Sequence, residues 1–130
     1  MLDVIEHVND PVSLLSEYSR FLKHDGQLVI TTPNAHRSID FLNIIRSNDY
    51  GLNYEHSLWF CPLTFIEVVE RVSFFEINSF SWLEHYYIID STHRFGLRVR
   101  MWIDQLLWKS RKNFSPNFMF VLKLTNDKNE

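Results

Sequence analysis

The run Gln27-Leu28-Val29-Ile30-Thr31-Thr32 constrains the fold more than any other part of the chain. It is short, rich in β-branched residues and almost continuously apolar, and it lies between the turn residues Asp25-Gly26 and Pro33-Asn34. Such a run is typical of a strand that is buried on both faces of a parallel sheet. Because parallel strands need helical connections, the run predicts an α/β fold.

The segments around this strand have helical or strand periodicity. Asp10-Pro11 is a good helix start, and apolar residues follow at helical spacing up to Leu22. We expect this helix to end at Asp25-Gly26, with Gly26 in the left-handed conformation. Further patterns predict helices over 38–47, 63–72 and 91–110, and strands over 75–82 and 118–124. We therefore expect one domain over residues 1–124, followed by a frayed tail over 125–130.

Composition excludes several classes of protein. The chain has 130 residues and a net charge of −3, which argues against a dedicated nucleic-acid-binding protein. Cys61 is the only cysteine, so no intrachain disulfide and no cysteine-based zinc site can form. No apolar run is long enough to cross a membrane, and the N-terminal residues do not have the pattern of a signal peptide. A cytoplasmic location is the expectation that fits these features.

Two carboxylates and an imidazole lie close together near the N-terminus, as Asp3-x-x-Glu6-His7, and His56 is a fourth candidate. Oxygen and imidazole ligands suit a divalent ion such as Mg²⁺ or Mn²⁺. A second interpretation is that His7 acts as a general base or positions a substrate, since imidazole titrates near neutral pH. A third is that the cluster has a purely structural role.

Basic residues are concentrated in the last predicted helix and just after it. Over residues 91–112 they are Arg94, Arg98, Arg100, Lys109, Arg111 and Lys112. A basic amphipathic helix that contains tryptophan is a candidate for contact with an anionic membrane surface. The alternative is a packing helix with a solvated basic edge.

Several segments together resemble the C-terminal half of class I S-adenosylmethionine-dependent methyltransferases. Asp3-Val4-Ile5-Glu6-His7-Val8-Asn9-Asp10-Pro11 is similar to the segment after the family's fourth strand, and residues 21–34 are similar to its fifth strand with the preceding turn. His56-Ser57-Leu58-Trp59-Phe60-Cys61-Pro62 resembles a loop that leads into the next helix, and residues 117–123 resemble the closing antiparallel strand. The family's glycine-rich cofactor loop has no counterpart in this chain, so the sequence is interpreted as N-terminally truncated.

The resemblance implies both an architecture and an activity. Three strands would follow the order 5-7-6, with the last one antiparallel between the others, and the open edge of strand 27–32 would permit self-association. The implied reaction is methyl transfer from S-adenosylmethionine, with the acceptor expected to be an oxygen of a small molecule or sugar. The alternative is a non-catalytic remnant or subunit that needs a partner chain.

The resemblance also assigns residues to the site. Leu2 and Asp3 would touch the cofactor, while Glu6 and His7 would be catalytic. Similarity to small-RNA 3′-terminal methyltransferases and ubiquinone-pathway O-methyltransferases implies that the metal ligands are Asp3, Glu6, His7 and His56. Asn34 and Trp59 are candidate substrate contacts, although Asn34 also suits a turn cap and Trp59 a place in the core.

Overall fold

The structure is a computed structural model that describes residues 1–47, 55–84, 92 and 94–125. Its strands are β1 (Gln27–Pro33), β2 (Phe75–Leu83) and β3 (Asn117–Leu124). Its α-helices are α1 (Pro11–Phe21), α2 (Ser38–Ser47), α3 (Pro62–Val72) and α4 (Phe95–Ser110). Two 3₁₀ turns, η1 (Ile5–His7) and η2 (Lys112–Phe114), had no clear sequence signal. The predicted α/β class is confirmed. Of the predicted frayed tail over 125–130, Thr125 is described and its N–H donates to the Phe74 carbonyl at 3.0 Å, while residues 126–130 lie outside the described part.

The three strands form one sheet in the order β1-β3-β2. β3 is antiparallel to both neighbours, with Phe120 opposite Ile30 on one side and opposite Phe80 on the other. The last strand therefore lies between the other two, as expected. The numbering 5-7-6 depends on a correspondence with other proteins and stays a prediction.

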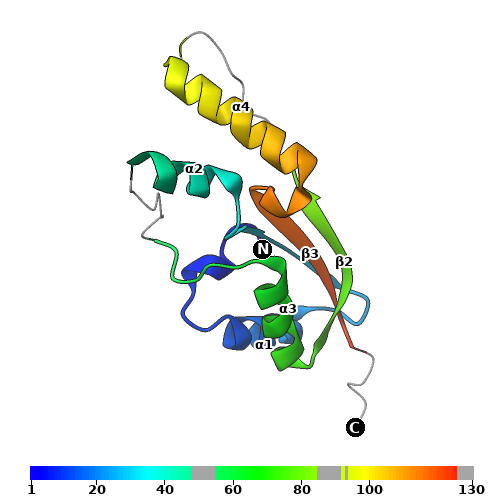
Figure 1. Ribbon diagram of the computed structural model, residues 1–130. Coiled ribbons are helices and arrows are strands. Elements are labelled where there is room, and N and C mark those ends of the chain that lie inside the picture. The colour runs from blue at the N-terminus through cyan, green and yellow to red at the C-terminus, as the bar shows by residue number, and fades with distance from the viewer. Residues whose placement is uncertain (48–54, 85–91, 93, 126–130) are drawn as a thin grey trace.

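One face of the sheet carries the hydrophobic core. Phe118, Phe120 and Leu122 alternate along β3 and are fully buried on this face, against which α1 and α3 lie (Figure 1). Phe65 of α3 stacks on Phe120 with ring centroids 4.8 Å apart. Aromatic packing thus joins α3 to the central strand.

The prediction that the first strand is buried on both faces is wrong for its first half. Leu28 and Ile30 are buried, but Val29, between them, is 37% exposed. Successive side chains of a strand point to opposite faces, and α1 and α3 cover only the face of Leu28 and Ile30. Thr31 and Thr32 are both buried, so two-sided burial is restricted to the end of β1 that leads to the site.

The free edge of β1 is shorter than the sequence led us to expect. Residues 1–3 lie alongside it in the parallel direction, with Leu2 opposite Thr31. The Thr31 N–H donates to the Met1 carbonyl at 3.0 Å, and the Asp3 N–H donates to the Thr31 carbonyl at 3.0 Å. The Val29 carbonyl also accepts a hydrogen bond from the Met1 amino group at 2.6 Å, so the edge is open to another strand only before this carbonyl, and self-association there stays a prediction.

The first helix ends earlier than predicted. α1 stops at Phe21, and Leu22 already has an extended backbone. Gly26 closes the following turn by donating to the Lys23 carbonyl at 2.8 Å, without the left-handed conformation that we expected. Glycine is required there for space, because a Cβ at Gly26 would lie 2.8 Å from Leu22 Cδ2 and 2.9 Å from the Lys23 carbonyl.

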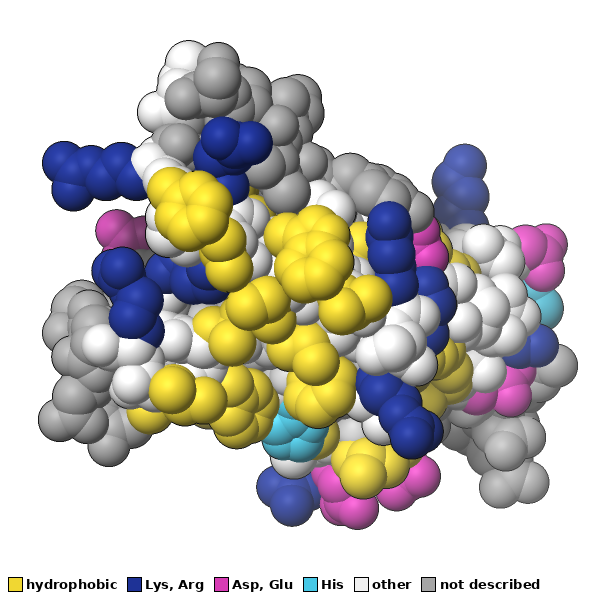
Figure 2. Space-filling model, turned by 45° about the horizontal axis from the view of Figure 1, so that its top comes forward, with side chains coloured by type: hydrophobic (Ala, Val, Ile, Leu, Met, Phe, Trp, Pro, Cys, Tyr) yellow, Lys and Arg dark blue, Asp and Glu magenta, His cyan; other side chains and the backbone are white. Residues whose placement is uncertain are grey.

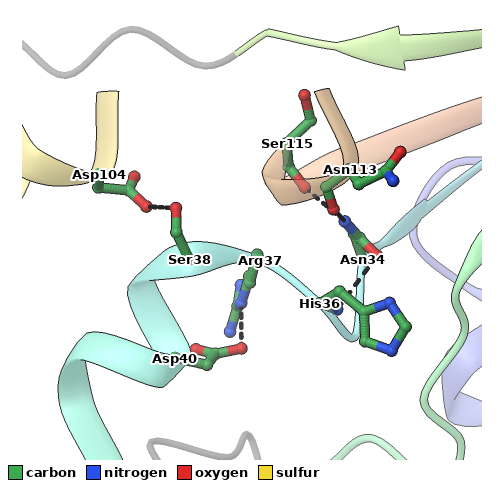
Figure 3. Close-up of polar contacts among 8 residues, drawn as sticks. All are labelled: Asn34, His36, Arg37, Ser38, Asp40, Asp104, Asn113 and Ser115. Carbon is green, nitrogen blue, oxygen red and sulfur yellow. Dashed lines mark hydrogen bonds and ion pairs between the residues drawn. The ribbon is translucent and has the colours of Figure 1, made fainter. Parts of the chain in front are cut away.

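α2 and α4 lie against each other beyond the carboxyl ends of β1 and β2 (Figure 1). Ser38 at the start of α2 hydrogen-bonds to the buried carboxylate of Asp104 in α4 (Figure 3), and Arg100 hydrogen-bonds to Asn43. α4 begins at Phe95 rather than at residue 91, since Arg94 is its N-cap and Thr92 lies in a turn; residues 91 and 93 are outside the described part. Among the described helices, none has the length and apolar character needed to cross a membrane.

Candidate active site

The segment Asp3-x-x-Glu6-His7, which we call the acidic motif, lies at the carboxyl end of β1. Residues 1–3 run parallel to this strand, so the chain turns into η1 beside the point where β1 ends. The loop before α3 joins the same place: the Leu58 N–H donates to the Glu6 carbonyl at 3.0 Å, and the Ala35 N–H donates to the Phe60 carbonyl at 2.7 Å. Ligand sites of α/β proteins form at this end of their parallel strands.

Glu6 is a buried carboxylate with one oxygen engaged. Its side chain is 1% exposed, and the Thr32 hydroxyl donates to Oε2 at 3.0 Å. The other oxygen, Oε1, is buried and has no hydrogen-bond partner among the described residues. A buried carboxylate oxygen is costly to leave unpaired, so this atom favours a bound cation or a polar ligand.

His7 and His56 face each other beside Glu6. Their rings are edge-to-face with centroids 4.7 Å apart. His7 Nδ1 lies 2.9 Å from the Glu55 carbonyl, which can only accept a hydrogen bond, so Nδ1 carries the hydrogen and Nε2 of the neutral ring is an acceptor. His56 is half-buried, and its Nδ1 has no hydrogen-bond partner within the part of the chain that the structure describes.

The three side chains Glu6, His7 and His56 therefore converge, and we call them the triad. One ligand atom from each lies within 4.8 Å of the other two. Nitrogen and oxygen donors at this separation fit a divalent metal ion, and the orphaned Glu6 Oε1 and His56 Nδ1 agree with that fit. The structure thus brings together three of the four predicted metal ligands.

Asp3, the fourth predicted ligand, does not belong to this group. The Asp3 carboxylate accepts a hydrogen bond from the Thr31 hydroxyl at 2.9 Å, and Asp3 is exposed to solvent. The Asp3 backbone has a positive φ of 49°, which is uncommon for a non-glycine residue and favoured by aspartate. Leu2 is also exposed, and the predicted cofactor contacts of Leu2 and Asp3 stay predictions.

Asn34 is fully buried with its amide engaged (Figure 3). Its Nδ2 donates to the carbonyls of Asn113 and Ser115, at 2.8 Å each, and its Oδ1 accepts from the His36 N–H at 3.1 Å. Since both donors and the carbonyl are engaged, this geometry favours the structural alternative over direct substrate contact. Asn34 ties the end of β1 to the segment that enters β3.

Trp59 connects the triad to a hollow of about 490 Å³. Its ring is tilted against His56 with centroids 5.2 Å apart, and the side chain is half-buried. The hollow lies between the start of α1 and the outer side of α3, and it is lined by Asp10, Pro11, Val12, Leu58, Trp59, Phe60, Thr64, Glu67, Val68 and Arg71. A substrate contact by Trp59 stays a prediction.

The N-cap residues of α1 and α3, Asp10 and Cys61, have shifted pKa values. The Ser13 hydroxyl and N–H donate to the Asp10 carboxylate, at 2.6 and 3.0 Å, and lower its pKa. For Cys61, burial raises the pKa of the thiol, but hydrogen bonds from the Thr64 backbone and side chain outweigh it, and the pKa is lowered overall. Both groups stabilise helix starts, of α1 and α3 respectively.

Thr31 and Thr32 were not singled out from the sequence. Adjacent strand residues point to opposite faces, so one threonine reaches Asp3 and the other reaches Glu6. The sequence signal that could have indicated their role is the pair of hydroxyl side chains at the end of an otherwise apolar strand. From β1, these hydroxyls donate hydrogen bonds to the two carboxylates of the acidic motif.

Comparison with known proteins finds similarity in structure but none in sequence. No protein-family model matches the sequence, and no curated protein matches it in sequence. The structure is similar to that of a SAM-dependent methyltransferase from Archaeoglobus fulgidus, with a TM-score of 0.53 and 20% identity over 95% of this chain and 57% of that one. A structure from Bacillus halodurans C-125, described as a candidate methyltransferase, aligns with a TM-score of 0.49 and 17% identity over 95% of this chain and 64% of that one.

The chain spans less than two thirds of either solved structure. The likeness to the Archaeoglobus fulgidus protein is one of fold, since the two sequences share few residues. The described residues therefore share their fold with part of that SAM-dependent methyltransferase.

Proposed function

We propose that this chain belongs to an S-adenosylmethionine-dependent methyltransferase that methylates an oxygen of a small molecule or sugar. The observation that carries the proposal is the convergence of Glu6, His7 and His56 at the carboxyl end of β1. The similarity of fold to a SAM-dependent methyltransferase supports methyl transfer as the reaction class. A fold alone does not indicate which atom accepts the methyl group. The triad favours a hydroxyl acceptor because its groups can bind and deprotonate an oxygen.

S-adenosylmethionine, when bound, supplies a methyl group on a sulfonium sulfur that a nucleophilic oxygen can displace. The residues of this chain expected to touch it are Leu2 and Asp3, which lie beside β1 and are open to solvent. The Thr31 hydroxyl holds the Asp3 carboxylate in place for this contact. The glycine-rich part of such a site would have to come from residues outside this chain.

His7 is the candidate general base. The Glu55 carbonyl holds the Nδ1 hydrogen, so the ring is oriented and Nε2 can accept the proton of a substrate hydroxyl. A carboxylate oxygen of Glu6 lies within 4.8 Å of a ring nitrogen of His7, close enough to stabilise the resulting imidazolium. This role requires Nε2 to be free of metal.

A divalent ion is the second candidate for the same place. Glu6, His7 and His56 would hold it, and the hydrogen bonds from Thr32 and to Glu55 would orient two of the three ligands. When bound, such an ion lowers the pKa of a coordinated hydroxyl and draws its oxygen into position. The two roles of His7 exclude each other, so one measurement distinguishes them.

Titration of Mn²⁺ into the protein, followed by calorimetry, is that measurement. Saturable binding that His56→Ala abolishes and His36→Ala preserves supports the metal role, since His36 is exposed and lies outside the triad. Absence of binding leaves the base role, which predicts that His7→Ala removes methyl transfer while His56→Ala reduces it less.

Titration of S-adenosylhomocysteine, with and without Mg²⁺, tests the methyltransferase proposal itself. Saturable binding supports it. No heat up to millimolar ligand would instead favour the alternative of a non-catalytic remnant or a subunit that needs a partner chain. Mixing with a candidate partner would then restore binding only if that partner supplies the rest of the cofactor site.

A further inference from the structure

The outer side of α4 carries a stripe of large apolar side chains. Phe95, Val99, Trp102 and Leu106 are spaced by three or four residues and are 79%, 40%, 60% and 54% exposed. Residues at this spacing lie on one face of a helix, so the four form a continuous surface that we call the outer stripe. Figure 2, which brings the end of the molecule with α4 forward, shows a band of hydrophobic side chains with Lys and Arg side chains along its margins.

The opposite side of α4 faces the protein and buries both a tryptophan and a carboxylate. Asp104 and Trp108 are 2% and 1% exposed there, while the four side chains of the outer stripe face outward. The contacts of Asp104 with Ser38 and of Arg100 with Asn43 fix the helix in this rotation. Rotating α4 to bury the outer stripe would break both contacts, so the exposure of the stripe is built into the packing.

Basic residues border the outer stripe on α4. Arg94, Arg98 and Lys109 are exposed on one flank, and the only acid of the helix, Asp104, is buried on the far side. At the N-terminal end of α4, a hollow of about 380 Å³ is lined by Arg46, Arg94, Gly96, Leu97 and Arg100.

This hollow has the chemistry of an anion site. The Nε of Arg100 is buried and has no hydrogen-bond partner among the residues that the structure describes. In the first turn of α4 the Leu97 and Arg98 N–H groups already donate to the Arg94 carbonyl, at 2.9 and 3.1 Å, so the positive charge of the hollow comes from its arginines. Three guanidinium groups favour a phosphate group.

We propose that α4 docks on an anionic lipid surface, with the outer stripe in the boundary between headgroups and acyl chains. Arg94, Arg98 and Lys109 would contact lipid phosphates at the level of the headgroups, and the arginine-lined hollow would take one phosphate. An apolar stripe that contains Phe and Trp beside a basic flank is the pattern of a helix that lies in a membrane interface.

Two other occupants of the stripe are less compatible with these observations. A second copy of the chain would bring its own basic flank to a symmetric contact, so like charges would face each other. A segment that extends the sheet would join at the edge of β1, where residues 1–3 already pair, whereas α4 packs on α2 and η2. The charge of the flank therefore favours lipid.

Vesicle co-sedimentation tests the proposal, with phosphatidylcholine vesicles compared with vesicles that also contain phosphatidylglycerol. We expect binding to the anionic vesicles only, weakening as salt is added, with a blue shift of the tryptophan fluorescence that the loss of Trp102 removes, since Trp102 is one of four tryptophans. The double variants Arg98→Glu/Lys109→Glu and Phe95→Ser/Trp102→Ser should each bind at least about tenfold more weakly. Matched controls on other elements, Lys23→Glu/Arg71→Glu and Leu63→Ser, should bind like the original protein.

Circular dichroism melts show whether each variant folds, and the salt dependence of the unchanged protein gives a result that needs no variant. The proposal is overturned if the protein ignores both kinds of vesicle, if it binds them equally, or if the charge variant binds like its control. It is also overturned if analytical ultracentrifugation shows self-association that Phe95→Ser/Trp102→Ser abolishes while vesicles do not bind. In that case copies of the chain cover the outer stripe.

Discussion

The hydroxyl of Thr32 donates a hydrogen bond to Glu6 Oε2 at 3.0 Å, and both side chains are about 1% exposed. This bond links the end of β1 to the η1 turn, two segments that are otherwise joined through residues 1–3. It engages one oxygen of Glu6, while the other, Oε1, has no hydrogen-bond partner among the described residues. The carboxylate is therefore oriented by a residue that takes no part in the triad itself.

Thr32→Val should destabilise the protein and weaken the site together. The substitution keeps the shape of the side chain but removes the only described donor to the Glu6 carboxylate, so this buried group is left without a hydrogen bond among the described residues. We expect the free energy of unfolding to fall by ~1–3 kcal/mol. Urea denaturation measures this change, and Mn²⁺ titration measures the effect on the triad.

Thr31→Val is the matched control on the adjacent residue. Thr31 makes the equivalent bond to Asp3, whose carboxylate is exposed, so water can replace the lost hydroxyl. Its effect should stay within ~1 kcal/mol. Equal losses in the two variants would show that burial of Glu6 does not decide the cost.

Ser38→Ala should loosen α4 from α2. The Ser38 hydroxyl bonds to the Asp104 carboxylate, which is buried between the helices, and without it this charge has lost its described partner. A loss of ~1–3 kcal/mol is expected, together with faster amide hydrogen exchange in α4. Ser110→Ala is the control, since that exposed hydroxyl bonds only to the Leu107 carbonyl of its own helix and should change stability by less than ~0.5 kcal/mol.

The secondary structure of the chain followed closely from its sequence, because local signals decided it. Asp10-Pro11 begins α1, and residues 38–47 form the predicted helix α2. The misplaced end of α1 depends on packing within one turn: we expected a left-handed conformation at Gly26, but crowding by Leu22 and Lys23 is what requires glycine. Such crowding has no periodicity that a sequence could display.

The site was predictable in its residue types but only partly in its geometry. Glu6, His7 and His56 converge as the motif suggested, but Asp3 is held away by Thr31. The direction of the Asp3 side chain depends on its positive φ, which spacing along the chain does not determine. The exposure of Trp102 also required the structure, since a tryptophan in an amphipathic helix is equally compatible with the core.

The two glycines of the described residues should respond to alanine in opposite directions. A Cβ at Gly96 would have nothing within 4 Å, so Gly96→Ala should stabilise α4 by ~0.5–1 kcal/mol through helix propensity. A Cβ at Gly26 would lie 2.9 Å from a backbone carbonyl that cannot move away freely, so Gly26→Ala should destabilise by ~1–3 kcal/mol. Thermal melts of both variants check the signs, and a stabilising Gly26→Ala would contradict the crowding described here.

Asp10 should make the stability of α1 depend on pH. Hydrogen bonds from Ser13 lower the pKa of its carboxyl from the ordinary value of 3.8, so folding favours the charged form. The stabilisation is therefore complete above pH 3.8 and is lost as the pH falls through the lower folded-state pKa. Asp10→Ala should melt at a lower temperature than the original protein at neutral pH, and the difference should shrink in acid, where the protonated cap accepts hydrogen bonds poorly.

Asp10→Asn separates capping from charge, since asparagine caps the helix without titrating. The melting temperature of this variant relative to the original protein should rise as the pH is lowered. A difference that stays constant with pH would mean that the Asp10 charge contributes nothing to stability.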